Sequence, residues 1–471
     1  MTATRSPSSP DLVERALELA ARADDHAGTS VLVHEESTAN LRWACNTLTT
    51  NGMSTGQTVT VATAVRTERG TCVGTVSRKG VGPDDLASLV AEATAAARSA
   101  PAAEDAAELP AGREDAAFGE AAEHTGPSVL SGVAGQLGEA LQQAHSSERE
   151  LFGFAEHTVT TTWLGTSAGA RRRHVQPKGT LEMTGKSHQR SRSTYDCRYT
   201  TDFTDVDVLA MDAGLVQRLE WQGRRIDLEP GRYDTVLPAG SVADLLIYLY
   251  FVSDARSAYE GRTVFSKKGS PGTTRVGERL TDVPLTIGGA PTYPGLECEP
   301  FVATGSSSPH HSVFDNGLDM PAATWVDQGV LAALPTSRFT SAMTGLPLTH
   351  ALDNLVVTSP EGRGGLDDLV ASTTRGLLVT SLWYIREVDP ASLLLTGLTR
   401  DGVYLVEDGE VQGSVTNFRF NESPVDMLRR IDAIGETGIA LNREWNEFFS
   451  RTAMPPMRIR GFNMSSVSQG T

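Results

Sequence analysis

The sequence predicts an α+β fold in which two α/β sandwich-like units precede a large, glycine-rich antiparallel β domain. We expect that domain to be barrel-like and to hold one central buried helix. Three observations predict this order. Alternating strand-like segments lie between amphipathic helices in the first 225 residues, a helical segment at 241–261 is apolar nearly all round, and glycines and prolines interrupt short apolar runs beyond it. At 471 residues the chain also exceeds the size of one ordinary core.

Residues 1–100 are expected to form the first α+β domain. Its opening segment has apolar residues at helical spacing, with Asp11 in the position of an N-cap. Asn51-Gly52 is a turn signal between segments that alternate like antiparallel strands, and a second helix is expected from Pro83. The strand-like segments are 29–37, 40–48 and 58–65.

A linker and a second unit are expected next. Residues 101–123 are rich in Ala, Glu and Pro and nearly free of bulky apolar side chains, which is typical of a linker or mobile segment. Residues 124–225 are expected to form a central α+β domain. It would begin with a helix after Pro127, continue as strands with glycine turns and close with a helix at 205–221.

Residues 226–471 are expected to form the β-rich C-terminal domain around the apolar helix. The run LLVTSLWYI at 377–385 has the composition of a strand that is buried on both faces. Asp408-Gly409 lies between two short apolar runs, which is a hairpin signal. A last helix is expected at 424–434 and a final strand at 457–462.

Charge and composition limit the classes of function. The chain has 41 basic and 58 acidic residues, so its net charge of −17 disfavours binding to nucleic acid. No apolar run of about 18 residues occurs, so we expect no membrane span, and the N-terminal segment lacks a signal-peptide core. The four cysteines are scattered, as is typical of reduced thiols. We therefore expect a cytoplasmic protein.

Two motifs near residue 170 are candidate sites. GTSAG at 165–169 matches the G-x-S-x-G pattern that presents a nucleophilic serine, here Ser167. Because its flanking segments are strand-like rather than strand followed by helix, a hairpin turn is the preferred interpretation. The basic cluster Arg171-Arg172-Arg173-His174 is the one local exception to the acidic balance, and we expect it to be a solvated strand or hairpin arm.

Histidines give two further candidates. HEEST at 34–38 begins like the zinc motif H-E-x-x-H, but the second histidine is missing and the flanks of His34 are strand-like. His310 and His311 follow three serines in an expected surface loop, where a weak metal or substrate contact is the alternative. Motifs alone therefore assign no self-sufficient active site.

Several blocks of sequence, in a fixed order, carry a family resemblance. They read EGRTVFSKK at 260–268, FDNGLDMPAATWVDQGVL at 314–331, and RGLLVTSLWY, LTGLTRDGVYLVEDGEV and FRFNESPVDMLRRIDAIG between 375 and 435. Together they resemble the C-terminal signature of the TldD/TldE (PmbA) family. The resemblance implies a cytoplasmic metalloprotease complex in which a TldD-like subunit carries zinc and a TldE-like subunit completes the chamber.

The zinc motif of the TldD-like members is replaced in this chain. The TldD-like members carry H-E-x-x-x-H on a helix and a cysteine near the C-terminus. Counting back from Phe265 places that window on 246–251, which reads LIYLYF, and no histidine occurs between His188 and His310. Residues 434–471 contain no cysteine. Since zinc catalysis needs about three protein ligands, the chain is similar to TldE/PmbA, the subunit without the metal.

The resemblance thus implies a non-catalytic pseudoenzyme subunit of a heterodimeric TldD/TldE zinc metalloprotease. Its substrates would be peptides, in natural-product maturation or in degradation of unfolded peptides. We assign no catalytic, metal or cofactor residue and expect no cofactor in this chain; zinc is expected in the TldD-like partner. The alternative is a homodimeric binding or scaffold protein of the same fold, and a serine hydrolase at Ser167 is the weakest of the three interpretations.

Overall fold

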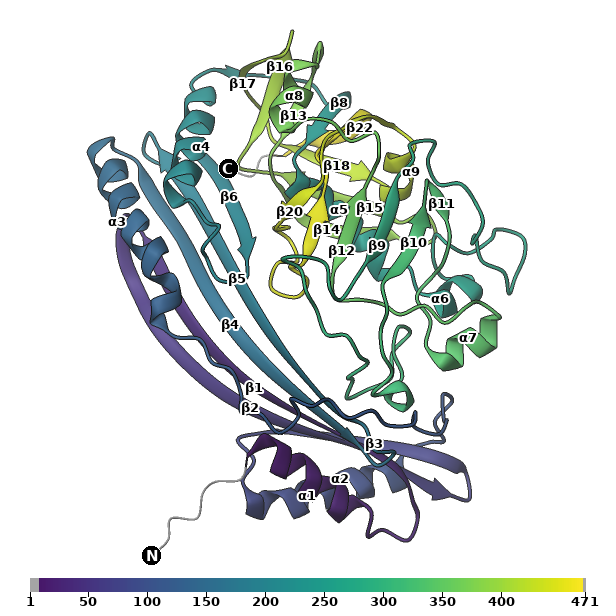
Figure 1. Ribbon diagram of the computed structural model, residues 1–471. Coiled ribbons are helices and arrows are strands. Elements are labelled where there is room, and N and C mark those ends of the chain that lie inside the picture. The colour runs from purple at the N-terminus through teal and green to yellow at the C-terminus, as the bar shows by residue number, and fades with distance from the viewer. Residues whose placement is uncertain (1–7, 469–471) are drawn as a thin grey trace, which may run out of the picture.

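The N-terminal part of the computed structural model, which describes residues 8–468, is built on one curved six-stranded antiparallel sheet. Its strands are β1 (His26–Ala44), β2 (Thr47–Thr67), β3 (Gly70–Lys79), β4 (Glu150–Thr166), β5 (Arg171–Ser187) and β6 (Arg192–Thr200), in the order β3-β2-β1-β4-β5-β6. Figure 1 shows that the C-terminal domain lies on the concave side of this sheet and that helices lie on its other side.

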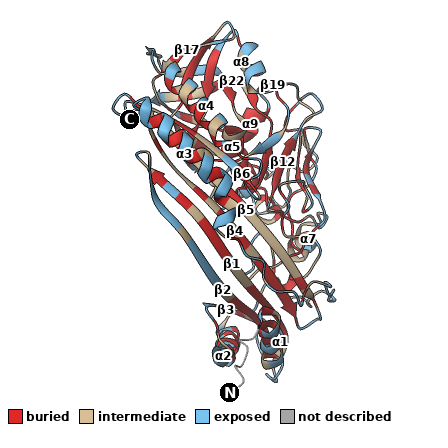
Figure 2. Cartoon of the chain, turned by 60° about the vertical axis from the view of Figure 1, so that its left-hand side comes forward, coloured by how far each residue is buried: buried red, intermediate tan, exposed pale blue. Residues whose placement is uncertain are grey.

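Four helices cover the convex face in two groups. They are α1 (Ser9–Ala20), α2 (Pro83–Ser99), α3 (Ser131–Ser146), which follows the short η1 (Pro127–Leu130), and α4 (Val208–Trp221). Odd-numbered residues of β1 face the helices: Val31 and Val33 pack in the cluster of α1 and α2, and Leu41 and Trp43 in the cluster of α3. Figure 2 shows buried residues recurring along the strands and exposed residues on the outer side of α3.

The two predicted N-terminal units share this sheet. β1 pairs with β4 without a register shift from Ser30↔Thr166 to Trp43↔Gly153. Each unit also contributes a tryptophan to the apolar cluster of the other: Trp43 of β1 packs in the cluster of α3 and α4, and Trp163 of β4 packs in the cluster of α1 and α2. The boundaries at 100 and 124 therefore stay a prediction, and the strands on either side of them form one continuous layer.

The C-terminal domain contains two further sheets with α5 (Ala239–Phe251) between their strands, which confirms the central buried helix. The first comprises β9 (Thr286–Gly289), β10 (Ala323–Asp327), β11 (Val330–Leu331), β12 (Leu355–Thr358), β20 (Gly438–Ala440) and β21 (Thr452–Met454). The second comprises β7 (Arg225–Ile226), β8 (Gly231–Leu237), β13 (Arg375–Val379), β14 (Leu382–Asp389), β15 (Leu394–Thr399), β16 (Val403–Glu407), β17 (Glu410–Val415), β18 (Phe418–Glu422), β19 (Ile431–Ile434) and β22 (Met457–Val467). Every residue from Ser241 to Tyr250 is buried.

The remaining helices of the domain are short. They are α6 (Ala255–Tyr259), η2 (Val313–Asp315), α7 (Arg338–Thr344), α8 (Leu366–Ala371) and α9 (Pro424–Leu428). The expected helix at 241–261 is thus divided into α5 and α6, because the carboxylate of Asp254 accepts a hydrogen bond from the amide of Ser257 and starts a new helix. The expected helix at 424–434 ends at Leu428, since Ile431–Ile434 pairs with β22.

The observed hairpins test three local predictions, of which two are wrong and one is confirmed. Asn51-Gly52 is not a turn but lies inside β2; the turn is at Cys45-Asn46, both with positive φ, where Asn46 Nδ2 donates to the carbonyl of Arg149 (2.7 Å). The run 377–385 is two strands, because β13 pairs with β16 whereas β14 pairs with β15. Asp408-Gly409 is confirmed as the hairpin turn between β16 and β17.

At the first helix, Asp11 is not the N-cap. Ser8 occupies that position, and the carboxylate of Asp11 accepts hydrogen bonds from the amide (3.0 Å) and the hydroxyl (2.7 Å) of Ser8. The helix therefore begins three residues earlier than expected, and Asp11 closes its first turn from inside.

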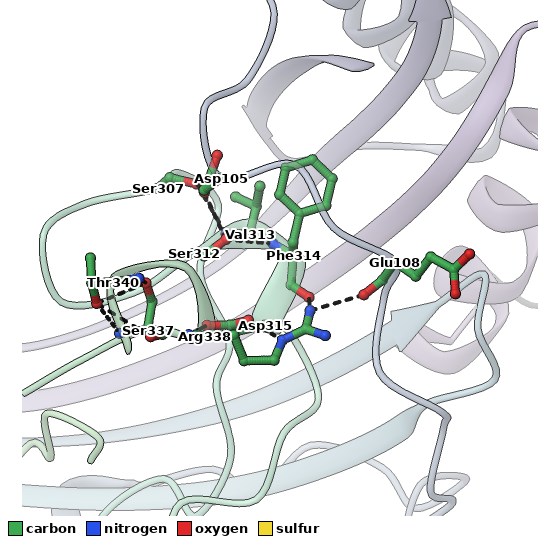
Figure 3. A network of polar contacts seen from close by, with 10 residues as sticks. All are labelled: Asp105, Glu108, Ser307, Ser312, Val313, Phe314, Asp315, Ser337, Arg338 and Thr340. Atoms are coloured by element: carbon green, nitrogen blue, oxygen red, sulfur yellow. Dashed lines mark hydrogen bonds and ion pairs between the residues drawn. The ribbon is translucent and has the colours of Figure 1, made fainter. Parts of the chain in front are cut away.

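Residues 101–123, called the strap below, form an irregular segment that contacts both parts of the molecule. The carboxylate of Asp105 accepts hydrogen bonds from the hydroxyls of Ser307 (2.5 Å) and Ser312 (2.7 Å) in the C-terminal domain. Arg338 donates to the carbonyl of Glu108 (2.9 Å) and pairs with the buried carboxylate of Asp315 (2.6 Å; Figure 3). The segment that composition marks as a linker is thus tied to the C-terminal domain by ionic and polar contacts.

Candidate functional site

The concave face of the curved sheet forms the floor of a polar groove. The even-numbered residues of β1 point to this side, opposite to the apolar residues that contact the helices. The register places these residues in four rows across β1, β4 and β5: His34–Thr162–His174, Glu36–Thr160–Gln176, Thr38–Thr158–Lys178 and Asn40–Glu156.

The C-terminal domain rests on the concave face at both ends of this floor. At one end Leu32 and Leu164 of the sheet pack on Phe301. At the other end Tyr199 of β6 packs with Leu441 and Ala453. Between these two contacts Glu299, Asp353, Glu447 and Arg451 from the C-terminal domain line the same cavity as the polar rows, and its volume is about 620 Å³.

Burial controls the protonation of the groups at the first row. It raises the pKa of Glu299 to about 8, an effect that a hydrogen bond from Thr162 and the charge of Arg451 oppose. Burial also lowers the pKa of His34 and of His174. At neutral pH this end of the groove therefore holds a protonated carboxyl group and two neutral imidazoles.

The carboxyl group of Glu156 lies at the opposite end, within the influence of two further carboxylates. Burial raises the pKa of Glu156; the charge of Lys178 opposes this shift, while the carboxylates of Glu36 and Glu447 add to it. The pKa of Lys178 is lowered by burial and by Arg451. Lys178 Nζ donates to the carbonyls of Asn446 (3.4 Å) and Glu447 (3.3 Å), which holds the loop above the floor. These carboxylates can accept hydrogen bonds from a ligand and can bind a positively charged group.

Ser167 lies in the turn between β4 and β5, as the hairpin interpretation predicts. Its Oγ accepts a hydrogen bond from the amide of Thr29 (3.0 Å), so the hydroxyl stabilises the turn. A strained elbow between a strand and a helix, which the G-x-S-x-G chemistry needs, is not formed here, since strands flank the turn on both sides.

The basic cluster is a strand, as expected, but it is not solvated throughout. Arg172 is 3% exposed and lies over the ring of Phe301 at 4.5 Å. It also pairs with Asp115 of the strap (3.0 Å) and with Asp319 (2.8 Å). These contacts join β5, the strap and the C-terminal domain, so the cluster has a structural role.

His310 and His311 lie in the loop before η2, with their ring centroids 6.5 Å apart. Burial lowers the pKa of His311 to about 4, and the neighbouring His310 and His350 add to this shift. The expected surface loop is therefore partly covered. Within residues 8–468, no group of three or more His, Cys, Asp or Glu side chains is arranged to hold a metal ion.

The window at 246–251 forms the last turns of α5. The hydroxyl of Tyr248 donates to the carbonyl of Ile385 (2.7 Å), and that of Tyr250 to the carbonyl of Leu352 (2.6 Å). Leu246, Ile247 and Leu249 are buried in the main apolar cluster. The side chains in this window therefore do not fit a zinc site, because they offer no imidazole or carboxylate and their two hydroxyls are already bonded.

A second cavity, of about 850 Å³, lies between α4, β6 and the first turns of α5. Its arginines are already paired: Arg443 with Asp401 (2.8 Å), and Arg198 (2.6 Å) and Arg218 (3.1 Å) with Asp196. The smaller groove on the concave face contains two buried acceptors, Asn40 Oδ1 and Glu299 Oε1, that have no hydrogen-bond partner among the described residues, so we regard it as the better candidate for ligand binding.

Motif spacing could not identify Glu299, Lys178 and Arg451, because they come from three distant segments. The usable signal is the alternation of polar residues in strand segments, as in Thr158, Thr160 and Thr162. Without the strand pairing, that alternation does not show which strands lie side by side.

Comparison with known proteins gives one family and several structures. A family model described as the PmbA/TldA metallopeptidase C-terminal domain matches residues 230–466. No curated protein sequence matches the chain. The fold is similar to that of TldE from Thermococcus kodakarensis, with a TM-score of 0.78 and 14% identity over 96% of this chain and 99% of that one.

Two further structures are described as candidate modulators of DNA gyrase. The one from Thermotoga maritima has a TM-score of 0.75 and 14% identity, over 96% of this chain and 99% of that one. The one from Bacteroides thetaiotaomicron has a TM-score of 0.74 and 13% identity, over 97% and 98%. At such identities the likeness shows the fold, whose α+β class and barrel-like antiparallel sheets are those expected from the sequence.

Proposed function

The chain belongs to the PmbA/TldD metallopeptidase family, and we propose that it is the non-catalytic, TldE/PmbA-like subunit of a heterodimeric TldD/TldE zinc metalloprotease in the cytoplasm. The observation that carries this proposal is the composition of α5 at 246–251. The position of the family's metal motif is filled by apolar side chains of the core and by two tyrosines bonded to backbone carbonyls.

In this proposal the chain contributes a wall of the chamber in which a TldD-like subunit cleaves peptides. The concave sheet and its polar groove would hold an extended peptide close to the partner's zinc. Two features support this role: the groove has hydrogen-bonding side chains along three neighbouring strands, and these strands are long enough to follow an extended chain. None of the helices among the described residues is long and apolar enough to cross a membrane.

A reconstitution experiment tests the proposal. The purified chain should contain zinc far below one ion per molecule by mass spectrometry and should cleave no unfolded peptide. Peptidase activity should appear when a TldD-like subunit from the same host is added, and the two should co-elute as one complex. Stoichiometric zinc together with peptidase activity in the isolated chain would contradict the proposal.

The second candidate is a homodimeric binding protein of the same fold. Affinity purification from the native host separates the two functions, because a TldD-like subunit is recovered in the first case and only further copies of this chain in the second.

A further inference from the structure

The groove on the concave face carries more negative than positive groups. Its lining includes five carboxyl side chains against one lysine and one arginine; Glu299 is protonated at neutral pH, which leaves four that can be negative, Glu36, Glu156, Asp353 and Glu447. Arg451 already has a partner, because its guanidinium pairs with the carboxylate of Asp353 and donates to the carbonyl of the same residue (3.0 Å). Lys178 alone is left to balance Glu36, Glu156 and Glu447.

Two buried acceptors in the lining have no hydrogen-bond partner among the described residues. They are Oε1 of Glu299, beside the His34–Thr162–His174 row, and Oδ1 of Asn40, in the row of Glu156. A buried acceptor without a donor is unfavourable by about 1 to 3 kcal/mol. Both atoms have almost no accessible surface, so a ligand reaches them only when the side chains of Glu299 and Asn40 turn into the groove. Because the two atoms lie at opposite ends of the floor, a ligand that supplies donors to both must follow the groove.

The length of the floor indicates what kind of ligand this is. From His34 to Asn40 the floor extends over six residues of β1, which is roughly 20 Å at 3.3 to 3.4 Å per residue. An extended peptide of about six residues has the same length and carries N–H donors along both edges. The hydroxyls of Thr38, Thr158 and Thr160 lie between the two ends and can exchange hydrogen bonds with such a backbone.

We propose that this groove selects extended peptides that carry a lysine or arginine side chain, and that Glu156 and Glu447 bind the cationic group while the carboxylate of Glu36, two rows away, adds to the negative potential. At the other end the carboxyl group of Glu299 accepts a hydrogen bond from the peptide backbone. Burial, together with the carboxylates of Glu36 and Glu447, disfavours the ionisation of Glu156, and a bound cation offsets the repulsion between these carboxylates.

This inference rests on the proposed function only in taking the ligand to be a peptide. The charge preference is a property of this chain, so it is measured on the isolated chain without any TldD-like subunit. If the reconstitution experiment failed, the charge preference could still be confirmed or contradicted, because it is measured on the isolated chain.

The test uses fluorescence anisotropy with labelled octapeptides of Gly, Ser and Thr that carry one central residue. Peptides with lysine or arginine at that position should bind at least about tenfold tighter than those with norleucine, and glutamate should bind more weakly still. Added salt should reduce the difference, because the groove is open to solvent. Equal affinity for all four peptides would overturn the proposal.

Three variants locate the cationic group. Glu156→Gln should reduce the affinity for the lysine peptide roughly tenfold while leaving the norleucine peptide unchanged. Glu36→Gln changes an exposed carboxylate, so the substitution should not unfold the sheet. It should also lower the affinity for the lysine peptide. Glu139→Gln, on the exposed side of α3, changes the net charge equally and should have no effect. An unchanged preference in both groove variants would contradict the assignment.

Spermidine, measured by calorimetry, separates a peptide ligand from a free amine. We expect it to bind at least about tenfold more weakly than the lysine peptide, because it leaves the acceptor on Glu299 unsatisfied. If spermidine bound as tightly as the lysine peptide, the proposal that the ligand is a peptide would be wrong.

Discussion

At the scale of single residues, the buried pair Arg149–Asp212 joins α4 to the start of β4. The guanidinium donates to both carboxylate oxygens (2.7 and 3.0 Å), and both side chains are at most 9% exposed. Arg149→Met should lower the free energy of unfolding by about 3 to 5 kcal/mol, because it leaves Asp212 buried without its partner. The measurement is urea unfolding. Adding Asp212→Leu should recover most of the loss, and a double variant as unstable as the single one would contradict this account.

Asp244 gives the chain a predictable pH dependence. Burial raises its pKa to about 7, while hydrogen bonds from the amides of Glu444 (2.9 Å) and Arg443 (2.8 Å) oppose the shift. The folded state therefore retains a proton that the unfolded chain releases between about pH 4 and pH 7, so this group's stabilising contribution falls as the pH rises through that window.

Asp244→Asn tests this, since both amides donate to Oδ1, which asparagine also has. Relative to the variant, the wild-type chain should lose roughly 2 to 3 kcal/mol of unfolding free energy between pH 5 and pH 8. Urea titrations of both chains at these two pH values measure the difference. Parallel pH profiles would show that Asp244 is ionised in the folded state over the whole range.

At the scale of elements, glycines in α3 and β4 should respond oppositely to alanine. Gly135 and Gly138 lie on the exposed side of α3 with open space at the Cβ position, so each alanine should add about 0.5 to 1 kcal/mol of stability. At Gly153 a Cβ would lie 2.2 Å from the carbonyl oxygen of Glu182 and 2.3 Å from the ring of Trp43, so alanine must displace a strand or a core side chain. Thermal unfolding of the three variants measures the contrast, and a stabilised Gly153→Ala would contradict it.

Elements with a strong local signal could be predicted from the sequence, and those set by distant pairing could not. The hairpin at Asp408-Gly409 and the buried helix α5 follow from local composition. The break after Val379 does not, because it depends on β14 pairing with β15 rather than with β16. The same limit hid the groove: the polar alternation is visible in each strand, but the register that aligns Glu156 with Asn40 is not.

At the scale of the whole molecule, the strap should be held in place mainly by Arg338. Arg338→Met removes the partner of the buried Asp315 and the donor to the carbonyl of Glu108 (Figure 3). We expect a loss of about 2 kcal/mol or more in unfolding free energy and faster amide hydrogen exchange in residues 101–123.

Arg256→Met is the matched control for the strap. Arg256 pairs with Glu104 of the strap (2.8 Å), but the carboxylate side chain is 61% exposed, so its loss should change exchange and stability little. Equal exchange in the two variants would show that the strap is held by its other contacts instead. Composition predicts the irregular backbone of this segment, whereas its attachment depends on side chains more than 200 residues away.

The pairing of β1 with β4 has a consequence for how the chain is made. On the ribosome, β1 emerges with β2 and β3, but its other edge stays open until the residues up to Thr166 have been synthesised. A nascent chain in this state exposes unpaired amides and carbonyls along a long strand, which is a template for association with other chains. Chaperones that bind nascent chains should therefore be needed most during this interval of synthesis.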